Sequence, residues 1–377
     1  MQGIAAFPHS SQPRLVDLQE PSAPSARQVL CRTLQLGICG TDREILDSQQ
    51  PHCPPGEPFL VLGHECLARV ESLGALSPQQ AICLSDRLSG ADRGIQVGDL
   101  VVPVVRRALP QFSRRRVDML AVGQFTERGI FDEHGFSVPY WNDEPRYLMR
   151  VPPELRQFAV LTEPVAVAAK GVNEALLLQQ ARLEDGIWTS PPPRVLVTGM
   201  GPIAFAAALV ARARQWPCAI YGRDSEDSSR ARLTRDLGAD YVHQDRFEFS
   251  PQTIERDGYD LILECTGAES VVLATAPALR SCGVMVWLGS RRNPQPTSCN
   301  LGRLIRDGLI RNNLFIGCVN AAPRDFAEAL ARLDDWRRCS PPLLARMITD
   351  RLAPTDALDH FTARRRDSIK TVIEYPT

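Results

Sequence analysis

Short apolar runs separated by turn residues fill the first half of the chain. They lie at Val29–Leu36, Leu60–Val70, Gln96–Val105 and Tyr147–Val151. Apolar runs of this length, bounded by glycine, proline and small polar residues, are typical of β-strands. The pattern therefore predicts a mainly β unit in this half of the chain.

The pattern then becomes helical. Phe158–Leu178 is rich in alanine, valine, leucine and glutamate, and its first internal glycine is Gly171. This composition favours a helix. We expect this helix to carry the chain out of the β unit.

From Arg194 onwards, predicted strands alternate with predicted helices. The strands are Arg194–Thr198, Pro217–Tyr221, Tyr259–Cys265, Gly283–Gly289 and Leu314–Cys318, and the helices between the first of them are Pro202–Gln215 and Ser228–Leu237. Such alternation implies right-handed crossovers and a doubly wound parallel sheet, hence an α/β fold. The tail has a helical pattern at Phe326–Leu333 and a strand pattern at Ile369–Tyr375. We expect this last strand to return to the β unit.

Length and charge narrow the class of protein. A chain of 377 residues suits two domains, at roughly 100 to 200 residues each. Its 43 basic and 44 acidic residues nearly cancel, which argues against nucleic acid or an anionic membrane as a partner and favours a small molecule. The eleven cysteines are scattered and no secretion signal is recognisable, so we expect reduced thiols and a cytoplasmic location.

A glycine-rich turn follows the first strand of the alternating half. Gly199–Ala204 has the G-x-G-x-x-A pattern and opens a helix. The glycines allow a tight turn and close approach of the backbone, and the helix N-terminus attracts a pyrophosphate. The expected cofactor-binding residues here are Gly199, Gly201, Pro202, Ile203 and Ala204.

The end of the second strand, Tyr221–Ser225, bears on the choice between NAD and NADP. NAD enzymes usually place a carboxylate there to bind the ribose hydroxyls. If Gly222 is the last residue of the strand, the carboxylate is missing, and Arg223 with Ser225 would receive a 2′-phosphate. If Asp224 is the last residue, NAD is favoured. We prefer NADP.

Three candidate metal ligands lie in the first half. They are Cys39, His64 and Glu65, and a thiolate, an imidazole and a carboxylate together suit zinc while leaving room for water or substrate. Glu163, near the start of the connecting helix, is a further candidate that binds the metal directly or through water. Zinc at this site would lower the pKa of a bound hydroxyl before hydride transfer.

In these motifs the chain resembles the zinc-dependent medium-chain alcohol dehydrogenases, and among them the microbial glucose dehydrogenase branch. The resemblance is spread along nearly the whole chain and is most specific in Cys39–Ile45, Thr126–Ile130 and Val319–Ala321. It implies a GroES-like catalytic domain at 1–174 and 322–377 and a Rossmann domain at 175–321. It also implies a homo-oligomer, either a dimer or a tetramer.

The resemblance assigns roles to individual residues. Cys39, His64 and Glu65 match the catalytic zinc ligands, and Glu163 matches the additional, water-linked one. Thr41 matches the hydroxyl that relays the substrate proton, because a threonine hydroxyl both donates and accepts. The matches to sugar-binding residues are Glu127, Glu163 and Asn320, the last of which also lies near the nicotinamide. The implied reaction oxidises the anomeric hydroxyl of an aldose, with glucose leading, to a lactone.

The chain departs from this family at two places. Many members bind a structural zinc through four closely spaced cysteines, but no cysteine occurs between Cys83 and Cys218. We therefore expect no structural zinc and a lobe held by Phe112, Met119 and Leu120 or by a partner subunit. Val167 replaces a polar residue that some members direct toward the sugar, so another aldose, a polyol, a cyclitol or an amino alcohol such as threonine stays open, as does a cofactor-binding protein without catalysis.

Overall fold

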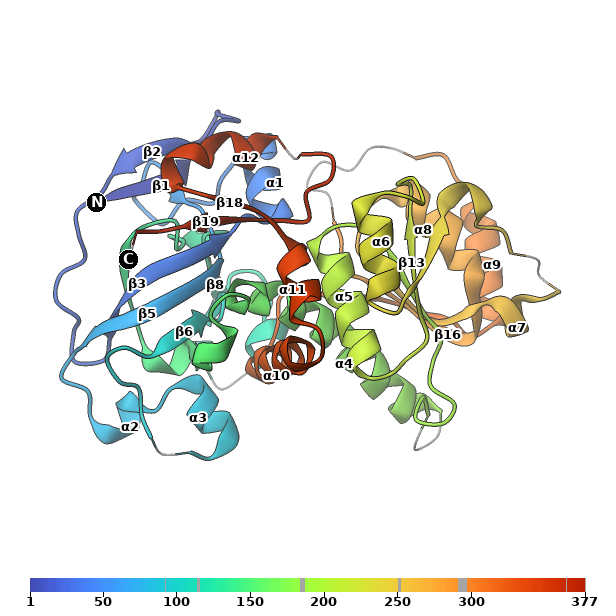
Figure 1. Cartoon of the computed structure of the whole chain (residues 1–377), viewed down its shortest axis with the longest axis horizontal. Coiled ribbons are helices and arrows are strands. Elements are labelled where there is room, and N and C mark those ends of the chain that lie inside the picture. The colour runs from blue at the N-terminus through green and yellow to red at the C-terminus, as the bar shows by residue number, and fades with distance from the viewer. Residues whose placement is uncertain are drawn as a thin grey trace. The chain divides into compact units, whose positions relative to one another are not determined.

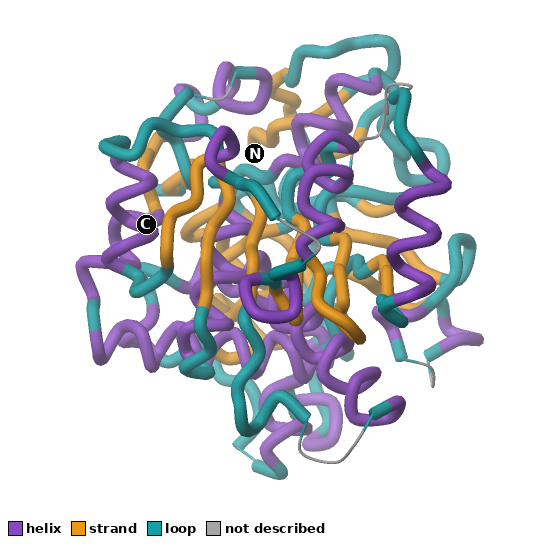
Figure 2. The backbone as a smooth tube through the Cα atoms, turned by 90° about the vertical axis from the view of Figure 1, so that its right-hand side faces the viewer, coloured by secondary structure: helices purple, strands orange, loops and turns teal. Residues whose placement is uncertain are grey.

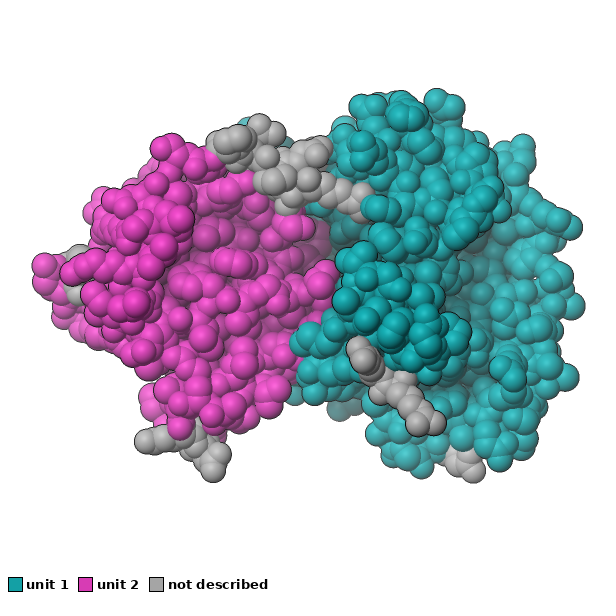
Figure 3. Space-filling model, turned by 180° about the vertical axis from the view of Figure 1, so that it is seen from behind, with its two compact units in different colours: residues 1–166, 320–377 teal, residues 167–319 magenta. Residues whose placement is uncertain are grey.

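The computed structural model divides into two compact units, coloured separately in Figure 3. Unit 1 is Met1–Ala166 with Asn320–Thr377, and unit 2 is Val167–Val319. The domain boundaries expected from the sequence were 174/175 and 321/322. The structure describes residues 1–91, 93–113, 116–183, 187–249, 252–290, 297–363 and 365–376.

A seven-stranded sheet forms the centre of unit 1 (Figure 1). Its order is β11-β6-β5-β3-β19-β18, with β10 paired to β3. The C-terminal strand β19 pairs antiparallel with β3, and Val372 lies opposite Gly37, so the last strand returns to the first unit as predicted. The strands are β3 (Val29–Gly37), β5 (Glu65–Leu73), β6 (Leu100–Pro103), β10 (Tyr140–Asp143), β11 (Leu148–Arg150), β18 (Ile348–Leu352) and β19 (Lys370–Glu374).

Two three-stranded sheets complete the β structure described for unit 1. One has the order β2-β1-β4 and the other β7-β8-β9. Their strands are β1 (Gln2–Ala6), β2 (Arg14–Asp17), β4 (Leu60–Val61), β7 (Arg106–Ala108), β8 (Phe125–Arg128) and β9 (Asp132–Glu133). The helices of this unit are α1 (Gly40–Ser48), α2 (Pro78–Ala81), α3 (Leu84–Ser89), α10 (Pro323–Cys339), α11 (Pro341–Met347) and α12 (Leu358–Thr362).

The single strand predicted over Leu60–Val70 is two strands, β4 and β5. The break falls at Gly63, whose φ of +91° lies in the region that favours glycine. A side chain at Gly63 would also approach Leu36 Cδ2 to 2.6 Å. The break places His64 immediately before β5 and Glu65 as its first residue.

The connecting helix α4 (Thr162–Arg182) begins four residues later than predicted, because Ala159–Leu161 forms a 3₁₀ turn. All four residues of Phe158–Leu161 thus lie outside the regular helix, although all four are buried. Glu163 consequently occupies the first turn of α4.

A six-stranded parallel sheet forms the centre of unit 2, with the order β14-β13-β12-β15-β16-β17. Helices α5 and α6 lie on one side of it and α8 and α9 on the other (Figures 1 and 2). This is the doubly wound α/β arrangement that the sequence predicted. The strands are β12 (Val195–Thr198), β13 (Cys218–Gly222), β14 (Asp240–His243), β15 (Tyr259–Glu264), β16 (Leu279–Trp287) and β17 (Leu314–Gly317). The helices are α5 (Pro202–Ala213), α6 (Ser229–Asp236), α7 (Ile254–Asp257), α8 (Glu269–Thr275) and α9 (Leu301–Ile310).

Both lysines of the chain are buried. Of 43 basic residues only Lys170 and Lys370 are lysines, and they are 1% and 0% exposed. Lys170 Nζ donates to the carbonyl of Val319 at 2.7 Å. No helix within the described ranges has the length and apolar character needed to cross a membrane.

Candidate functional site

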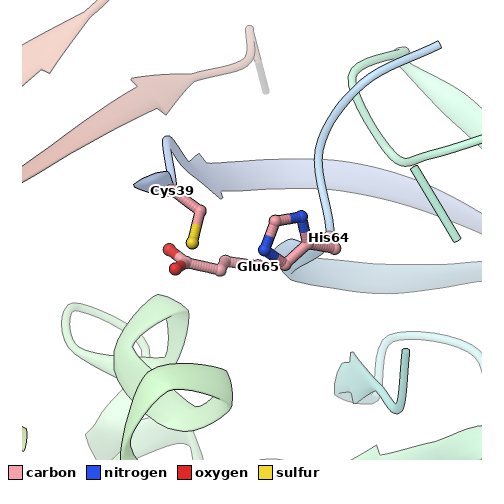
Figure 4. Close-up of side chains that lie close together, drawn as sticks. All are labelled: Cys39, His64 and Glu65. Carbon is pink, nitrogen blue, oxygen red and sulfur yellow. The ribbon is translucent and has the colours of Figure 1, made fainter. Parts of the chain in front are cut away.

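Cys39, His64 and Glu65 converge at one end of the unit 1 sheet, where their side chains point toward one another (Figure 4). One candidate ligand atom from each lies within 4.8 Å of the other two. Cys39 is the N-cap residue of α1, directly after β3, and Gly37 at the end of β3 pairs with Glu65 at the start of β5. The strand register therefore brings together ligands that are 25 residues apart in the sequence.

The Glu65 carboxylate occupies space that any side chain at position 37 would fill. A side chain on Gly37 would come within 2.1 Å of Glu65 Oε2, so only glycine leaves the space free. Lys370 Nζ donates to both Glu65 oxygens, at 2.7 Å to Oε1, and to the carbonyl of Ile38 at 3.3 Å. The Glu65 and Lys370 side chains are both fully buried. Burying a charged pair is favourable only with such complete pairing.

Asp42 connects the two ligand segments. Its carboxylate accepts hydrogen bonds from the backbone N–H of Cys39 at 2.8 Å and of Gly63 at 3.3 Å. Its Oδ1 also lies 3.6 Å from Nδ1 of His64. A carboxylate beside the second nitrogen of a metal-binding histidine orients the ring. Asp42 thus supports both neighbouring ligands.

Charges beside His64 and Asp42 outweigh the effect of burial on both groups. Burial alone would lower the pKa of His64, yet Asp42 and Cys39 raise it well above its usual value. Burial alone would raise the pKa of Asp42, and the neighbouring His64 lowers it instead. Asp42 and His64 therefore each favour the charged form of the other.

Thr41 and Glu163 lie beside this group. The Thr41 hydroxyl is 3.7 Å from Cys39 Sγ. Glu163 is not a fourth member of the 4.8 Å group found among the described residues. Burial first, and then the charges of Glu65 and Glu127, raise the pKa of the Glu163 carboxyl to about 7, against opposing effects of His64 and Lys370. Glu163 therefore lies within electrostatic reach of two of the candidate ligands, His64 and Glu65.

Glu127 and Asn320, the expected sugar-binding residues, contact each other. Asn320 Nδ2 donates to Glu127 Oε1 at 2.8 Å, although the two residues are 193 positions apart. Arg106 Nε donates to the same oxygen at 2.9 Å and the guanidinium lies 3.8 Å from the centroid of the Phe125 ring. All three polar side chains are largely buried. No motif in the sequence pointed to Arg106, since a lone arginine on a strand is usually a surface residue.

The lobe after β7 is held partly by charge. Arg116 binds both oxygens of buried Asp118 at 3.0 and 2.6 Å, and Arg106 donates to the Asp118 carbonyl at 3.4 Å. Leu120 is buried as expected, but Met119 is 54% exposed and does not provide the predicted packing. An arginine–carboxylate pair therefore supplements the apolar contacts expected there.

The glycine turn of unit 2 has the geometry of a dinucleotide-binding turn. Gly199 has a φ of +94°, and a side chain on it would meet Thr266 Cγ2 at 2.9 Å. Gly201 is the N-cap of α5 and Pro202 is its first residue. The turn follows β12, which lies between β13 and β15 where the strand order reverses. Ligands of doubly wound sheets bind at this switch point.

Strand β13 ends at Gly222, so no carboxylate stands at its last position. A side chain on Gly222 would approach Met200 Cγ to 2.8 Å. Asp224, two residues further on, is held by Arg230, whose Nε and Nη2 donate to its two oxygens at 2.6 and 2.8 Å. Arg223 is exposed. Of the two arrangements left open by the sequence, the structure has the one with Gly222 as the terminal residue.

Comparisons with known proteins agree with this architecture. Residues 156–375 match the family model described as glucose dehydrogenase C-terminus. Glucose 1-dehydrogenase 1 of Caldivirga maquilingensis is 35% identical over 99% of both chains. The glucose 1-dehydrogenase of Thermoproteus tenax is 35% identical, and the match spans 97% of this chain and 96% of that protein.

A solved structure has the same fold. It is the Haloferax mediterranei glucose dehydrogenase in complex with NADP, zinc and gluconolactone, with a TM-score of 0.82 and 24% identity over the full length of both chains. The GroES-like and Rossmann domains expected from the sequence are thereby confirmed. The chain belongs to the glucose 1-dehydrogenase family of medium-chain alcohol dehydrogenases.

Proposed function

We propose that this protein oxidises the anomeric hydroxyl of an aldose, with glucose the leading substrate, to a lactone, using one catalytic zinc ion and NADP. The observation that carries the proposal is the Cys39–His64–Glu65 group beside the Thr41 hydroxyl. The names of the full-length relatives support the same reaction.

The donor set fits zinc. A thiolate, an imidazole and a carboxylate are common zinc ligands, and three protein ligands leave a position for water or substrate. Cys39 and Glu65 bring negative charge to the dication, with Glu65 sharing its charge with Lys370. Glu163 would act as the additional ligand, directly or through water. When bound, zinc supplies the Lewis acidity that lowers the pKa of a substrate hydroxyl.

The residues of the chain then bind the sugar and move its proton. Thr41 accepts the hydroxyl proton and passes it toward solvent, since its own hydroxyl both donates and accepts. The free oxygen of Glu127, the one not bound by Arg106 and Asn320, accepts a hydrogen bond from a sugar hydroxyl. Asn320 orients that carboxylate and lies at the start of the segment that returns to unit 1.

NADP is the preferred cofactor because β13 ends without a carboxylate. The turn Gly199–Ala204 binds the pyrophosphate through its backbone and the N-terminus of α5. Arg223 and Ser225 are exposed beyond β13 and are available to a 2′-phosphate. NADP supplies the hydride acceptor.

We also propose that the protein has no structural zinc and forms a homo-oligomer through unit 2. The Arg116–Asp118 pair stands in the segment where the resemblance implies four zinc-binding cysteines and where this chain has none. Helix α9 exposes three apolar side chains at a spacing of four residues, namely Leu301, Ile305 and Leu309 at 56%, 59% and 74%. Within the described part of the chain, strand β17 is the last strand of its sheet, and an edge strand can pair with a second copy of the chain.

The experiment measures reduction of NAD and NADP with a panel of aldoses, polyols, cyclitols and threonine. It is repeated after zinc removal and with Cys39→Ala, using Cys339→Ala, an exposed cysteine of α10, as the matched control. We expect zinc-dependent turnover of an aldose that Cys39→Ala abolishes and Cys339→Ala retains. Turnover confined to a polyol, a cyclitol or threonine would replace the substrate assignment. Bound cofactor with no turnover of any compound would favour a non-catalytic role.

A further inference from the structure

We propose that Arg230 determines cofactor selectivity by masking the charge of Asp224, so that a 2′-phosphate is accepted beside an otherwise repulsive carboxylate. The inference rests on the proposed function, in particular on the preference for NADP. It concerns a residue of α6 to which the sequence assigned no role.

Asp224 lies two residues past the end of β13. It stands between Arg223 and Ser225, the two residues proposed to receive the 2′-phosphate. An unmasked carboxylate in this loop would attract the ribose hydroxyls of NAD and repel the extra phosphate of NADP. The sequence around Asp224 therefore contains opposing signals.

Both oxygens of the Asp224 carboxylate are engaged by one side chain. The Arg230 guanidinium binds both of its oxygens, at 2.6 and 2.8 Å, in the bidentate geometry that gives the strongest arginine–carboxylate pairs. The side chains are 11% and 13% exposed, so solvent screens the pair only weakly. Tyr241 fixes the loop further, because its hydroxyl donates to the Asp224 carbonyl at 2.5 Å.

Arg230 also contacts the turn that is proposed to bind the pyrophosphate. Arg230 Nη1 donates to the carbonyl of Met200, between the two glycines of the turn, at 3.2 Å. One guanidinium thus bridges the loop after β13 and the turn after β12. The Arg230 guanidinium therefore contacts both the Asp224 carboxylate and the proposed dinucleotide-binding turn. At this separation the charge of Asp224 affects the electrostatic potential at the turn.

The same helix, α6, provides a matched control. Arg232 lies two residues further along α6, is exposed, and donates to the carbonyl of Asp227 rather than to a carboxylate. Arg230→Gln and Arg232→Gln each remove one positive charge from the same helix. Only Arg230→Gln uncovers Asp224. The difference between them isolates masking from a general loss of positive potential.

The experiment measures dissociation constants by calorimetry for NADP and NAD, and for 2′,5′-ADP and 5′-AMP, which need no turnover. For Arg230→Gln we expect the preference for the 2′-phosphorylated ligand to fall by about tenfold, equivalent to about 1.4 kcal/mol. Asp224→Asn alone should not lower the preference, because it leaves the positive charge of Arg230 unpaired beside the 2′-phosphate. Arg230→Gln/Asp224→Asn should recover most of the preference that Arg230→Gln loses. Arg232→Gln should leave it nearly unchanged.

Other outcomes separate this inference from the proposed function. Equal loss of affinity for both ligands in Arg230→Gln, without recovery in the double variant, would assign Arg230 a purely structural role and overturn the masking. An equal effect of Arg232→Gln would do the same. If the unmodified protein binds neither 2′,5′-ADP nor NADP, or prefers NAD, the cofactor assignment itself fails and the masking fails with it.

Discussion

Lys370 serves as the counter-ion of Glu65 when no zinc is bound. The pair is fully buried, and removing one partner of a buried pair leaves an uncompensated charge. We expect Lys370→Met to lower the free energy of unfolding of the zinc-free protein by about 3 kcal/mol or more. Urea unfolding of protein treated with a chelator measures this change.

Zinc should stabilise the Lys370→Met variant more than the unmodified protein, because the metal replaces the missing positive charge beside Glu65. Lys370→Arg, which keeps the charge, is the control and should lose less stability. Equal stabilisation of all three proteins by zinc would contradict the counter-ion role and leave Lys370 as a packing residue.

Arg106 aligns Glu127 for the substrate. Hydrogen bonds to a charged group contribute about 1.5 to 3 kcal/mol, and Arg106 provides one of the two side-chain hydrogen bonds on Glu127 Oε1. We expect Arg106→Gln to raise KM for the aldose by about tenfold with a smaller change in kcat. Arg116→Gln, which loosens the same lobe through Asp118, is the comparison. A similar rise in KM for both variants would argue that only the lobe's stability matters.

At the residue scale, the candidate ligands could be named from the sequence, and their partners could not. Cys39, His64 and Glu65 are close to motifs with recognisable chemistry. Lys370 meets Glu65 across 305 residues and Asn320 meets Glu127 across 193. Contacts of such separation depend on strand register and on the return of the chain, which local pattern does not encode.

At the scale of elements, Glu163 in the first turn of α4 makes the stability of the zinc-free protein depend on pH. Its pKa is raised from 4.5 to about 7, so the native state holds its proton where the unfolded state has lost it. Stability of the zinc-free protein should therefore fall as pH rises from about 4.5 through about 7. Thermal unfolding across this window should show a smaller fall for Glu163→Gln, whose amide does not titrate. Parallel curves for the two proteins would contradict the assignment.

Helix α9 should mediate association. Leu309 is 74% exposed, and a charge placed in the middle of an apolar contact is costly to bury. Leu309→Arg should shift the protein toward monomer in sedimentation or light scattering. Leu88→Arg, at a leucine of α3 that is 46% exposed, should not. An unchanged mass for Leu309→Arg would place any association surface elsewhere.

Elements were predicted well where periodicity was regular and less well where a single residue interrupts it. In unit 2 the predicted strands β12, β13, β15 and β17 and the predicted helices α5 and α6 agree with the structure to within two residues at each end. Strand β16 begins four residues before its predicted start, and β14, α7, α8 and α9 were not predicted. The apolar run over Leu60–Val70 concealed the turn at Gly63, because nothing in the apolar pattern distinguishes a glycine with positive φ from one within a strand. That turn is what presents His64 and Glu65.

At the scale of the whole molecule, the sequence indicated that the two ends of the chain form one unit and that the middle forms another. The alternation of strand and helix identified the inserted unit, and the apolar run at Ile369–Tyr375 identified the returning strand. The strand pairing of β19 with β3 then brings Lys370 to Glu65. The fold of unit 1 and its candidate metal site are therefore completed by the same strand.

Burial of both lysines also has a chemical consequence for a protein proposed to oxidise reducing sugars. Open-chain aldoses condense with free amines, and here Lys170 and Lys370 are buried while the N-terminal amine donates to the Leu18 carbonyl at 2.8 Å. We expect the folded protein to gain at most one adduct from an amine-acylating ester, and up to three after denaturation, as read by intact mass. Two or more adducts on the folded protein would contradict this. An arginine-rich surface of this kind keeps its positive charges while offering glycation almost no amine to attack.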